Sequence, residues 1–67
     1  MLDLKKIRQM MDDRLITQSY MAMKLDLSLR SMRNKMSGAT EFKASELAKL
    51  AKILRVTIGS LFEQEGK

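Results

Sequence analysis

Apolar residues recur at helical spacing along most of the chain, and they nowhere alternate with period two over a run long enough for a strand. The clearest helix is predicted over 44–54, where leucine and alanine fall at i, i+3, i+4 and i+7. Another is predicted over 4–13, with apolar residues at i, i+3 and i+7. Shorter helices are expected over 18–24 and 29–36, and a final one- to two-turn helix, expected to include Phe62, follows Thr57. The pattern therefore predicts an all-α fold of five short helices.

Capping residues mark where these helices are expected to begin and end. A side-chain oxygen precedes four of them and can accept a hydrogen bond from a free backbone N–H of the first turn. These residues are Asp3, Thr17, Ser28 and Thr57. Gly38 follows the third helix, where a left-handed glycine commonly ends a helix. The segment 39–43 is expected to be an extended loop, and the tail over 63–67 is expected to fray.

The apolar stripes of the five helices define one expected core. It contains Leu4, Ile7, Met11, Ile16, Met21, Ala22, Leu25, Leu27, Met32, Met36, Phe42, Leu47, Leu50, Ala51, Leu54, Val56 and Leu61. The chain has seven methionines, and we interpret them as flexible side chains that fill an irregular core between short helices. Met23 is the exception, because the spacing places it on an outer face.

The segment 17–36 has the layout of a helix-turn-helix, in which the second of two short helices enters the DNA major groove. Ala22 is the small residue that lets the two helices approach closely. The expected base-facing residues are Ser28, Leu29, Arg30, Arg33 and Asn34. Arginine can pair with guanine, asparagine with adenine, and an aliphatic side chain with a thymine methyl. The alternatives are that the polar residues only solvate a helix, and that Leu29 packs on Tyr20.

Residues around this helix are candidates for contacts with the DNA backbone. Gln18 lies beside free backbone N–H groups at the start of a helix, which suit a phosphate oxygen. The expected phosphate contacts are Thr17, Gln18, Lys35, Thr40 and Lys43. For Gln18 the alternative is a polar residue of the first helical turn with no ligand.

The positive charge is concentrated on the same segment. The chain has a formal net charge of +5 and a pI of about 9.9. Three cations and no acid lie between residues 27 and 40, which leaves 5 − 3 = +2 for the rest of the chain. Such a distribution favours a polyanionic partner, although small basic domains also carry charge merely as a solvated surface.

Several classes of function are excluded by what the 67 residues contain. There is no cysteine and no histidine, so we expect no disulfide and no thiolate or imidazole metal ligand. Because there is also no convincing carboxylate pair and no phosphate-binding loop, we expect no metal site, no cofactor and no catalytic residue, and therefore no enzyme. The apolar runs are far shorter than the ~20 residues of a membrane helix. The basic N-terminus lacks the apolar stretch of a signal peptide. We expect a single helix-turn-helix domain over 1–67, a cytoplasmic location, and neither a membrane partner nor a small-molecule ligand.

Short pieces of sequence over residues 7–62 occur in the order typical of one family. They are Ile16-Thr17-Gln18, Met21-Ala22, Lys24-Leu25, Leu27-Ser28, Met32, Lys35-Met36-Ser37-Gly38, Phe42, Glu46-Leu47, Leu50-Ala51, Leu54, Val56-Thr57-Ile58 and Leu61-Phe62. On these residues the chain resembles the Cro/repressor-type (Xre-like) helix-turn-helix proteins of phages and bacteria. The resemblance implies a compact five-helix, lambda-repressor-like DNA-binding domain. It also implies a phosphate contact at Gln18 and base or backbone contacts at Ser28, Leu29, Arg30 and Asn34.

The chain departs from that family at several turns and caps. Leu15, Asp26 and Arg55 stand where the family often has glycine, so these turns must tolerate a side chain or close differently. Lys43 stands where a capping serine or threonine is usual, and Tyr20 replaces a frequent acidic residue.

The function expected from the sequence is a Cro-like repressor that binds double-stranded operator DNA as a dimer. Dimer contacts are expected from the C-terminal helices, with Ile53, Ile58 and Phe62 as candidates, unless these three residues only complete the monomer core. The alternative function is a protein-interaction module on the same fold, such as an antitoxin or a small phage protein that binds a host factor.

Overall fold

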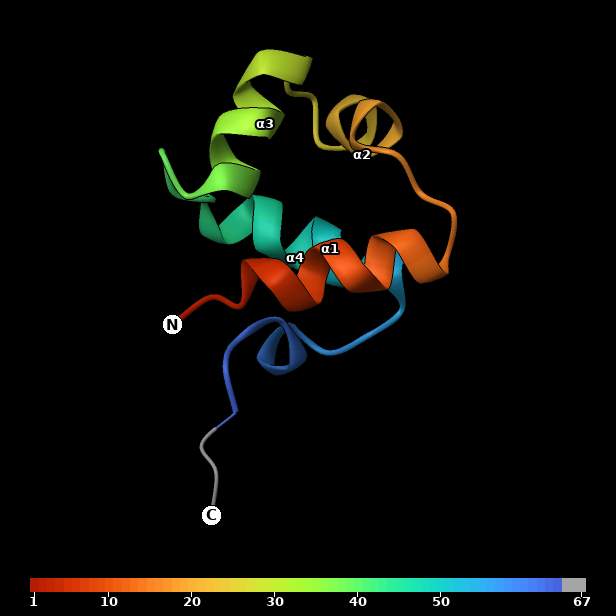
Figure 1. The fold of residues 1–67 in the computed structure, drawn as a ribbon, viewed down its shortest axis with the longest axis vertical. Helices are drawn as coiled ribbons and strands as arrows, with labels where there is room; N and C mark the ends of the chain where they lie inside the picture. Colours follow the sequence, from red (N-terminus) through yellow and green to blue (C-terminus); the bar gives the residue numbers. More distant parts are fainter. Residues whose placement is uncertain (65–67) are drawn as a thin grey trace.

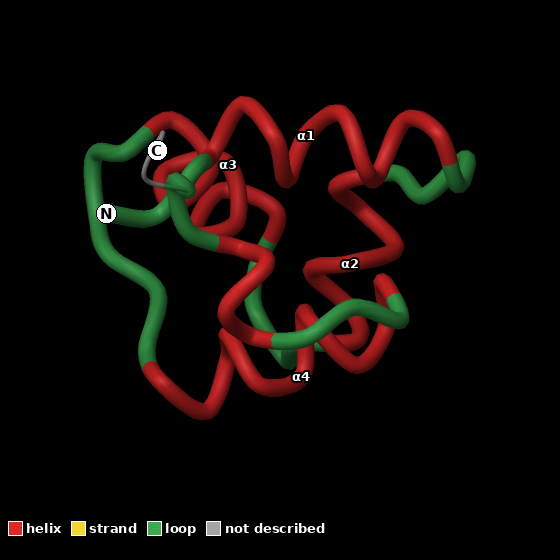
Figure 2. Tube along the Cα trace, turned by 90° about the horizontal axis from the view of Figure 1, so that it is seen from below, coloured by secondary structure: helices red, strands yellow, loops and turns green. Residues whose placement is uncertain are grey.

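Four α-helices and a 3-10 helix follow one another in the computed structural model, which describes residues 1–64 (Figure 1). They are α1 (Leu4–Asp13), α2 (Gln18–Lys24), α3 (Leu29–Ser37), α4 (Ala44–Leu54) and η1 (Ile58–Leu61). Loops join them, and no strand forms within the described residues (Figure 2). None of the described helices is long and apolar enough to cross a membrane. The all-α fold is confirmed, and among the α-helices only the end of α3 differs from its predicted position, by one residue.

The last predicted helix is wrong in type and extent. Residues Ile58–Leu61 form a 3-10 helix, whereas Phe62 has extended backbone with φ −105° and ψ 158°. Phe62 pairs instead with Leu2 in an isolated antiparallel bridge. This pairing with the beginning of the chain takes Phe62 out of helical geometry and ends η1 at the residue before it.

Two residues of the tail that was expected to fray are hydrogen-bonded. The Glu63 N–H donates to the Met1 carbonyl over 2.8 Å. The Gln64 side chain donates to the carbonyls of Gly59 and Phe62. The remaining tail residues, 65–67, lie outside the described residues. The two ends of the described chain therefore hold each other beneath α1 (Figure 1).

The expected caps begin four of the helices. Asp3, Thr17, Ser28 and Thr57 each accept a hydrogen bond from the backbone N–H three residues later. At α4 the arrangement differs, because the lysine ammonium of Lys43 has no acceptor atom. Here the Glu46 carboxylate accepts a 2.8 Å bond from the Lys43 backbone N–H, which is half of a capping box.

All four α-helices end in the same way. One or two residues past each helix end, one residue lies in the left-handed region, and the N–H that follows it donates to the carbonyl five residues back, as in a Schellman motif. Only the end of α3 uses glycine, Gly38, with φ 89°. The other three positions are Leu15, Asp26 and Arg55, with φ of 57°, 60° and 63°. The turns at which the chain departs from the family therefore keep left-handed backbone and carry a side chain there.

Replacing Leu15 with glycine is expected to raise the free energy of unfolding by up to about 1 kcal/mol. A non-glycine residue in left-handed backbone costs roughly 1–2 kcal/mol, partly offset by the freedom that glycine adds to the unfolded chain. The Leu15 side chain is 90% exposed and its loss costs little packing. Urea unfolding measures the change, with Leu15→Ala as the control, since alanine shortens the side chain but keeps the strain. If the glycine and alanine variants are equally stable, the left-handed backbone at residue 15 does not strain a non-glycine residue.

The core lies where the helices meet. Figure 1 shows α1 and α4 across the middle of the molecule, α2 and α3 on one side and η1 on the other. Every buried hydrophobic residue belongs to the predicted core, and the other predicted core residues pack against it. Met23 points outward as expected and is 65% exposed. Sequence periodicity missed Leu2 and Met10, which are partly buried and also pack on the core. Ile53 and Phe62, for which a dimer contact and a place in the core were both left open, pack on it too.

Replacing Ala22 with leucine is expected to lower the free energy of unfolding by about 1–3 kcal/mol, because extra methylenes in a packed core force neighbouring side chains to shift. Ala22 is 3% exposed on α2, which packs against α3. Thermal unfolding followed by circular dichroism measures the loss. The matched control is Met23→Leu on the exposed face of α2. An unchanged melting temperature in Ala22→Leu would contradict the close approach at this residue.

Candidate nucleic-acid interface

The turn between α2 and α3 fixes the second helix of the helix-turn-helix against the first. The Leu27 N–H donates to the Ala22 carbonyl over 2.8 Å, across the left-handed Asp26. The half-buried Leu27 packs on the core. Ser28 then caps α3, and its hydroxyl oxygen accepts from the Ser31 N–H over 3.0 Å. Backbone hydrogen bonds, the Ser28 cap and the packing of Leu27 thus fix the position of the start of α3.

One face of α3 is buried and the other is open. Met32 and Met36 anchor the buried face. The predicted base-facing residues Ser28, Arg30, Arg33 and Asn34 are exposed, whereas Leu29 is half-buried. Within residues 1–64, no hydrogen bond or ion pair occupies the side chains of Arg30, Arg33 and Asn34. These three polar groups are therefore free to meet a ligand beside α3.

Thr17 and Gln18 lie at the start of α2. The Thr17 hydroxyl oxygen accepts from the Tyr20 N–H over 3.0 Å, so it acts first as a cap. The Gln18 side chain is half-buried and makes no hydrogen bond within the described part of the chain. Of the two, Gln18 offers the uncommitted polar group.

Lys35 is already engaged by other groups of the fold. Its ammonium donates to the Glu41 carbonyl over 2.9 Å and lies 3.2 Å from a Glu46 carboxylate oxygen. It also lies 5.9 Å from the centre of the Phe42 ring. Its side chain is only 11% exposed, and so we withdraw Lys35 from the predicted phosphate contacts. Its spacing in α3 did not reveal that the loop after α3 folds back over it.

The Lys35–Glu46 pair ties the end of α3 to the start of α4. Burial raises the pKa of the Glu46 carboxyl, but the hydrogen bonds from the Lys43 backbone and from Lys35, with the charges of both lysines, outweigh it. The net result is a pKa below the ordinary value. Glu46 therefore remains charged in the folded protein and holds the loop that carries Thr40.

Thr40 lies in the loop after α3, and Lys43 lies at the beginning of α4. Both are exposed, and neither side chain makes a hydrogen bond within residues 1–64. They remain available to a ligand that runs past the end of α3.

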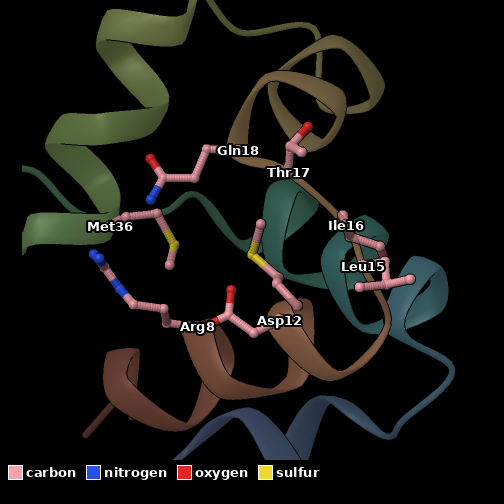
Figure 3. A pocket seen from close by; sticks show the side chains of 8 residues that line it. Arg8, Asp12, Leu15, Ile16, Thr17, Gln18 and Met36 are labelled. Atoms are coloured by element: carbon pink, nitrogen blue, oxygen red, sulfur yellow. The ribbon is translucent and has the colours of Figure 1, made fainter.

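A hollow opens between α1, the α1–α2 turn and the last turn of α3. Its volume is about 310 Å³, and it is lined by Arg8, Met11, Asp12, Leu15, Ile16, Thr17, Gln18 and Met36. Figure 3 shows the head groups of Arg8, Asp12 and Gln18 entering it, with Met36 on the side of α3. Sequence reasoning missed Arg8, because an isolated arginine on the first helix carries no motif.

The described residues hold no cluster of three or more acidic side chains that could bind a metal ion. Exposed polar side chains that make no hydrogen bond within the described residues instead lie along α3, which is capped at its N-terminus, packed on the core and part of a helix-turn-helix. A family model described as the Cro/C1-type HTH DNA-binding domain matches residues 6–67. The chain belongs to this family. Comparisons with curated proteins and with solved structures give no significant match.

Membership of the Cro/C1-type family confirms the resemblance drawn from the sequence pieces. It makes the chain a helix-turn-helix protein of a DNA-binding family, with α2 and α3 as its motif. The residues that contact DNA are not given by the match and follow only from the geometry of this chain.

Proposed function

We propose that the protein is a sequence-specific regulator of transcription that binds double-stranded DNA in the cytoplasm as a Cro-like repressor. The observation that carries this proposal is the open face of α3. Arg30, Arg33 and Asn34 are exposed and uncommitted there, on a helix held by its cap and its buried methionines. In the proposed complex the first turn of α3 enters the major groove.

The division of contacts follows from position. Ser28, Leu29, Arg30, Arg33 and Asn34 form the proposed base-facing set. Thr17, Gln18, Thr40 and Lys43 lie at the two flanks of α3 and form the proposed phosphate set. Phosphate contacts would fix the orientation of the protein, whereas base contacts would select the sequence. Asp26 is exposed just before α3 and must point away from the backbone for this docking.

The proposed mode of action is steric. A dimer that occupies two half-sites about 34 Å apart would cover one face of the duplex and exclude polymerase. Of the three dimer candidates, Ile53 and Phe62 pack partly on the core, whereas Ile58 is 47% exposed on η1. We therefore centre the proposed dimer contact on Ile58.

The second candidate function is a protein-interaction module. It is favoured by exposed apolar side chains around α2, where Leu15 is 90%, Met23 is 65% and Tyr20 is 43% exposed. Such a surface would suit a protein partner. The charge on α3 favours DNA, and so the repressor remains the main proposal.

Selection of bound sites from a random duplex pool tests the proposal. We expect an enriched inverted repeat with half-sites about one helical turn apart. The test variant is Arg30→Ala/Arg33→Ala, which should not enrich it. The matched control is Lys49→Ala/Lys52→Ala, which removes the same charge from the exposed face of α4. If the wild-type protein enriches no sequence from the pool, even at low salt, the repressor proposal is overturned and the interaction module is favoured.

A further inference from the structure

The hollow beside α1 brings together two donors from different helices. The Arg8 guanidinium extends from α1 and the Gln18 carboxamide from the start of α2, and both point toward the side of α3 that carries Met36 (Figure 3). Within residues 1–64, neither group makes a hydrogen bond or an ion pair. Gln18 is half-buried and Arg8 is exposed, so a group that enters from solvent can reach both.

We infer that this hollow binds a phosphodiester of the DNA backbone and that Arg8 is a phosphate ligand together with Gln18. The inference rests on the proposed function and extends the interface from the helix-turn-helix onto α1. Gln18 connects the helix-turn-helix interface with the hollow, because it belongs to the proposed phosphate set and also lines the hollow.

The chemistry of the hollow suits a phosphate oxygen. A guanidinium presents several N–H donors in one plane and is the side chain best matched to a phosphate. The Gln18 amide adds a neutral donor. Met11 and Met36 form an apolar wall at the same hollow, which limits the water that competes for these donors.

Asp12 opposes the anion. Its carboxylate also enters the hollow, one helical turn after Arg8 (Figure 3). No ion pair joins Asp12 to Arg8 in the described structure. A carboxylate beside a bound phosphate repels it. The inference therefore requires opposite effects on DNA affinity when Arg8 and Asp12 are each neutralised.

The first experiment measures the salt dependence of binding to a fluorescent duplex, with the full chain. Arg8→Gln should reduce the slope of log K against log salt by about 0.9, the value for one lost phosphate contact. Affinity would then fall about 3.5-fold less than in the wild type over a fourfold rise in salt. The matched control is Lys5→Gln, which removes one charge from an exposed position of α1 outside the hollow. Its slope should change less, and Asp12→Asn should bind more tightly than the wild type at low salt.

The second experiment identifies the phosphate. Neutral methylphosphonates are placed one at a time along the duplex, and each duplex is bound by wild type and by Arg8→Gln. One position should weaken the wild type clearly more than Arg8→Gln, since the variant has already lost the Arg8 contact and keeps only that of Gln18. Arg8→Lys, which keeps the charge, should restore part of this sensitivity.

The outcomes separate the two proposals. One outcome is that the wild type binds DNA, that Arg8→Gln and Lys5→Gln change the salt dependence equally, and that the affinity loss of Arg8→Gln is simply added to that of each methylphosphonate substitution. In that case the hollow binds no phosphate, and the proposed repressor function still stands. If the wild type binds no duplex at low salt, both proposals are overturned. Because Arg8 is exposed, the variant is expected to keep the wild-type melting temperature, which a thermal melt checks.

Discussion

Replacing Glu46 with alanine is expected to lower the free energy of unfolding by about 3 kcal/mol. Removing one partner of a buried ion pair leaves the other charge unpaired, which typically costs about 3–5 kcal/mol. The Glu46 and Lys35 side chains are 9% and 11% exposed, and the same carboxylate caps α4. A chain of this size has roughly 3–10 kcal/mol in total at about 0.05–0.15 kcal/mol per residue. Urea unfolding should therefore show that the variant has lost about a third or more of its stability.

The controls are Lys35→Met and the double variant Lys35→Met/Glu46→Ala. Lys35→Met and Glu46→Ala should each be destabilising, whereas the double variant should lose less than the sum, because no charge is then left unpaired. Additive losses would show that the two side chains do not interact and that Lys35 is free for another role, including the phosphate contact first expected of it.

The same residue predicts a change of stability with pH. The pKa of Glu46 is below 4.5 in the folded protein, so the unfolded chain binds the proton more readily. The stabilisation by Glu46 is complete above about pH 4.5 and is lost as the pH falls through the lower folded-state pKa. Glu46→Ala should lack this loss, whereas Glu41→Ala, at an exposed glutamate, should retain it. If the wild type, Glu46→Ala and Glu41→Ala lose the same amount of stability as the pH falls, the acid-dependent loss does not come from Glu46.

Replacing Arg30 with alanine is expected to weaken specific DNA binding by about 1–3 kcal/mol, roughly 5- to 150-fold in Kd, and to relax sequence preference at one base pair. Arg30 lies exposed in the first turn of α3, and its guanidinium can pair with both acceptors of a guanine. The measurement is the affinity for the selected site and for each of its single-base variants. The variant should stay folded, because Arg30 is exposed.

The comparison that decides the role of Arg30 uses unrelated duplexes. Loss confined to the selected site would identify a base contact, whereas equal loss on selected and random sequences would reduce Arg30 to a phosphate contact. Lys49→Ala on the exposed face of α4 supplies the control for a general loss of charge.

The candidate site was partly predictable from the sequence. Helical spacing and two caps placed Ser28, Arg30, Arg33 and Asn34 on the open side of α3, because helix geometry fixes which residues share a face. The same reasoning did not reveal the ion pair of Lys35, since its partner Glu46 lies eleven residues away and on another helix. Arg8 escaped notice for a related reason, as the hollow it lines exists only where α1 meets α2 and α3.

For this protein the sequence by itself determined the four α-helices, the caps at the start of three of them, and nearly every buried residue. Those features depend on hydrogen bonds and side-chain spacings within a few residues, which are readable along the chain. Only the tertiary structure decided the contacts between distant segments. Arg14 donates to the Leu54 carbonyl across forty residues, Leu2 pairs with Phe62, and Lys35 turns to Glu46. These contacts depend on how the helices cross, and the crossing is set by the packing of the whole core rather than by any local pattern.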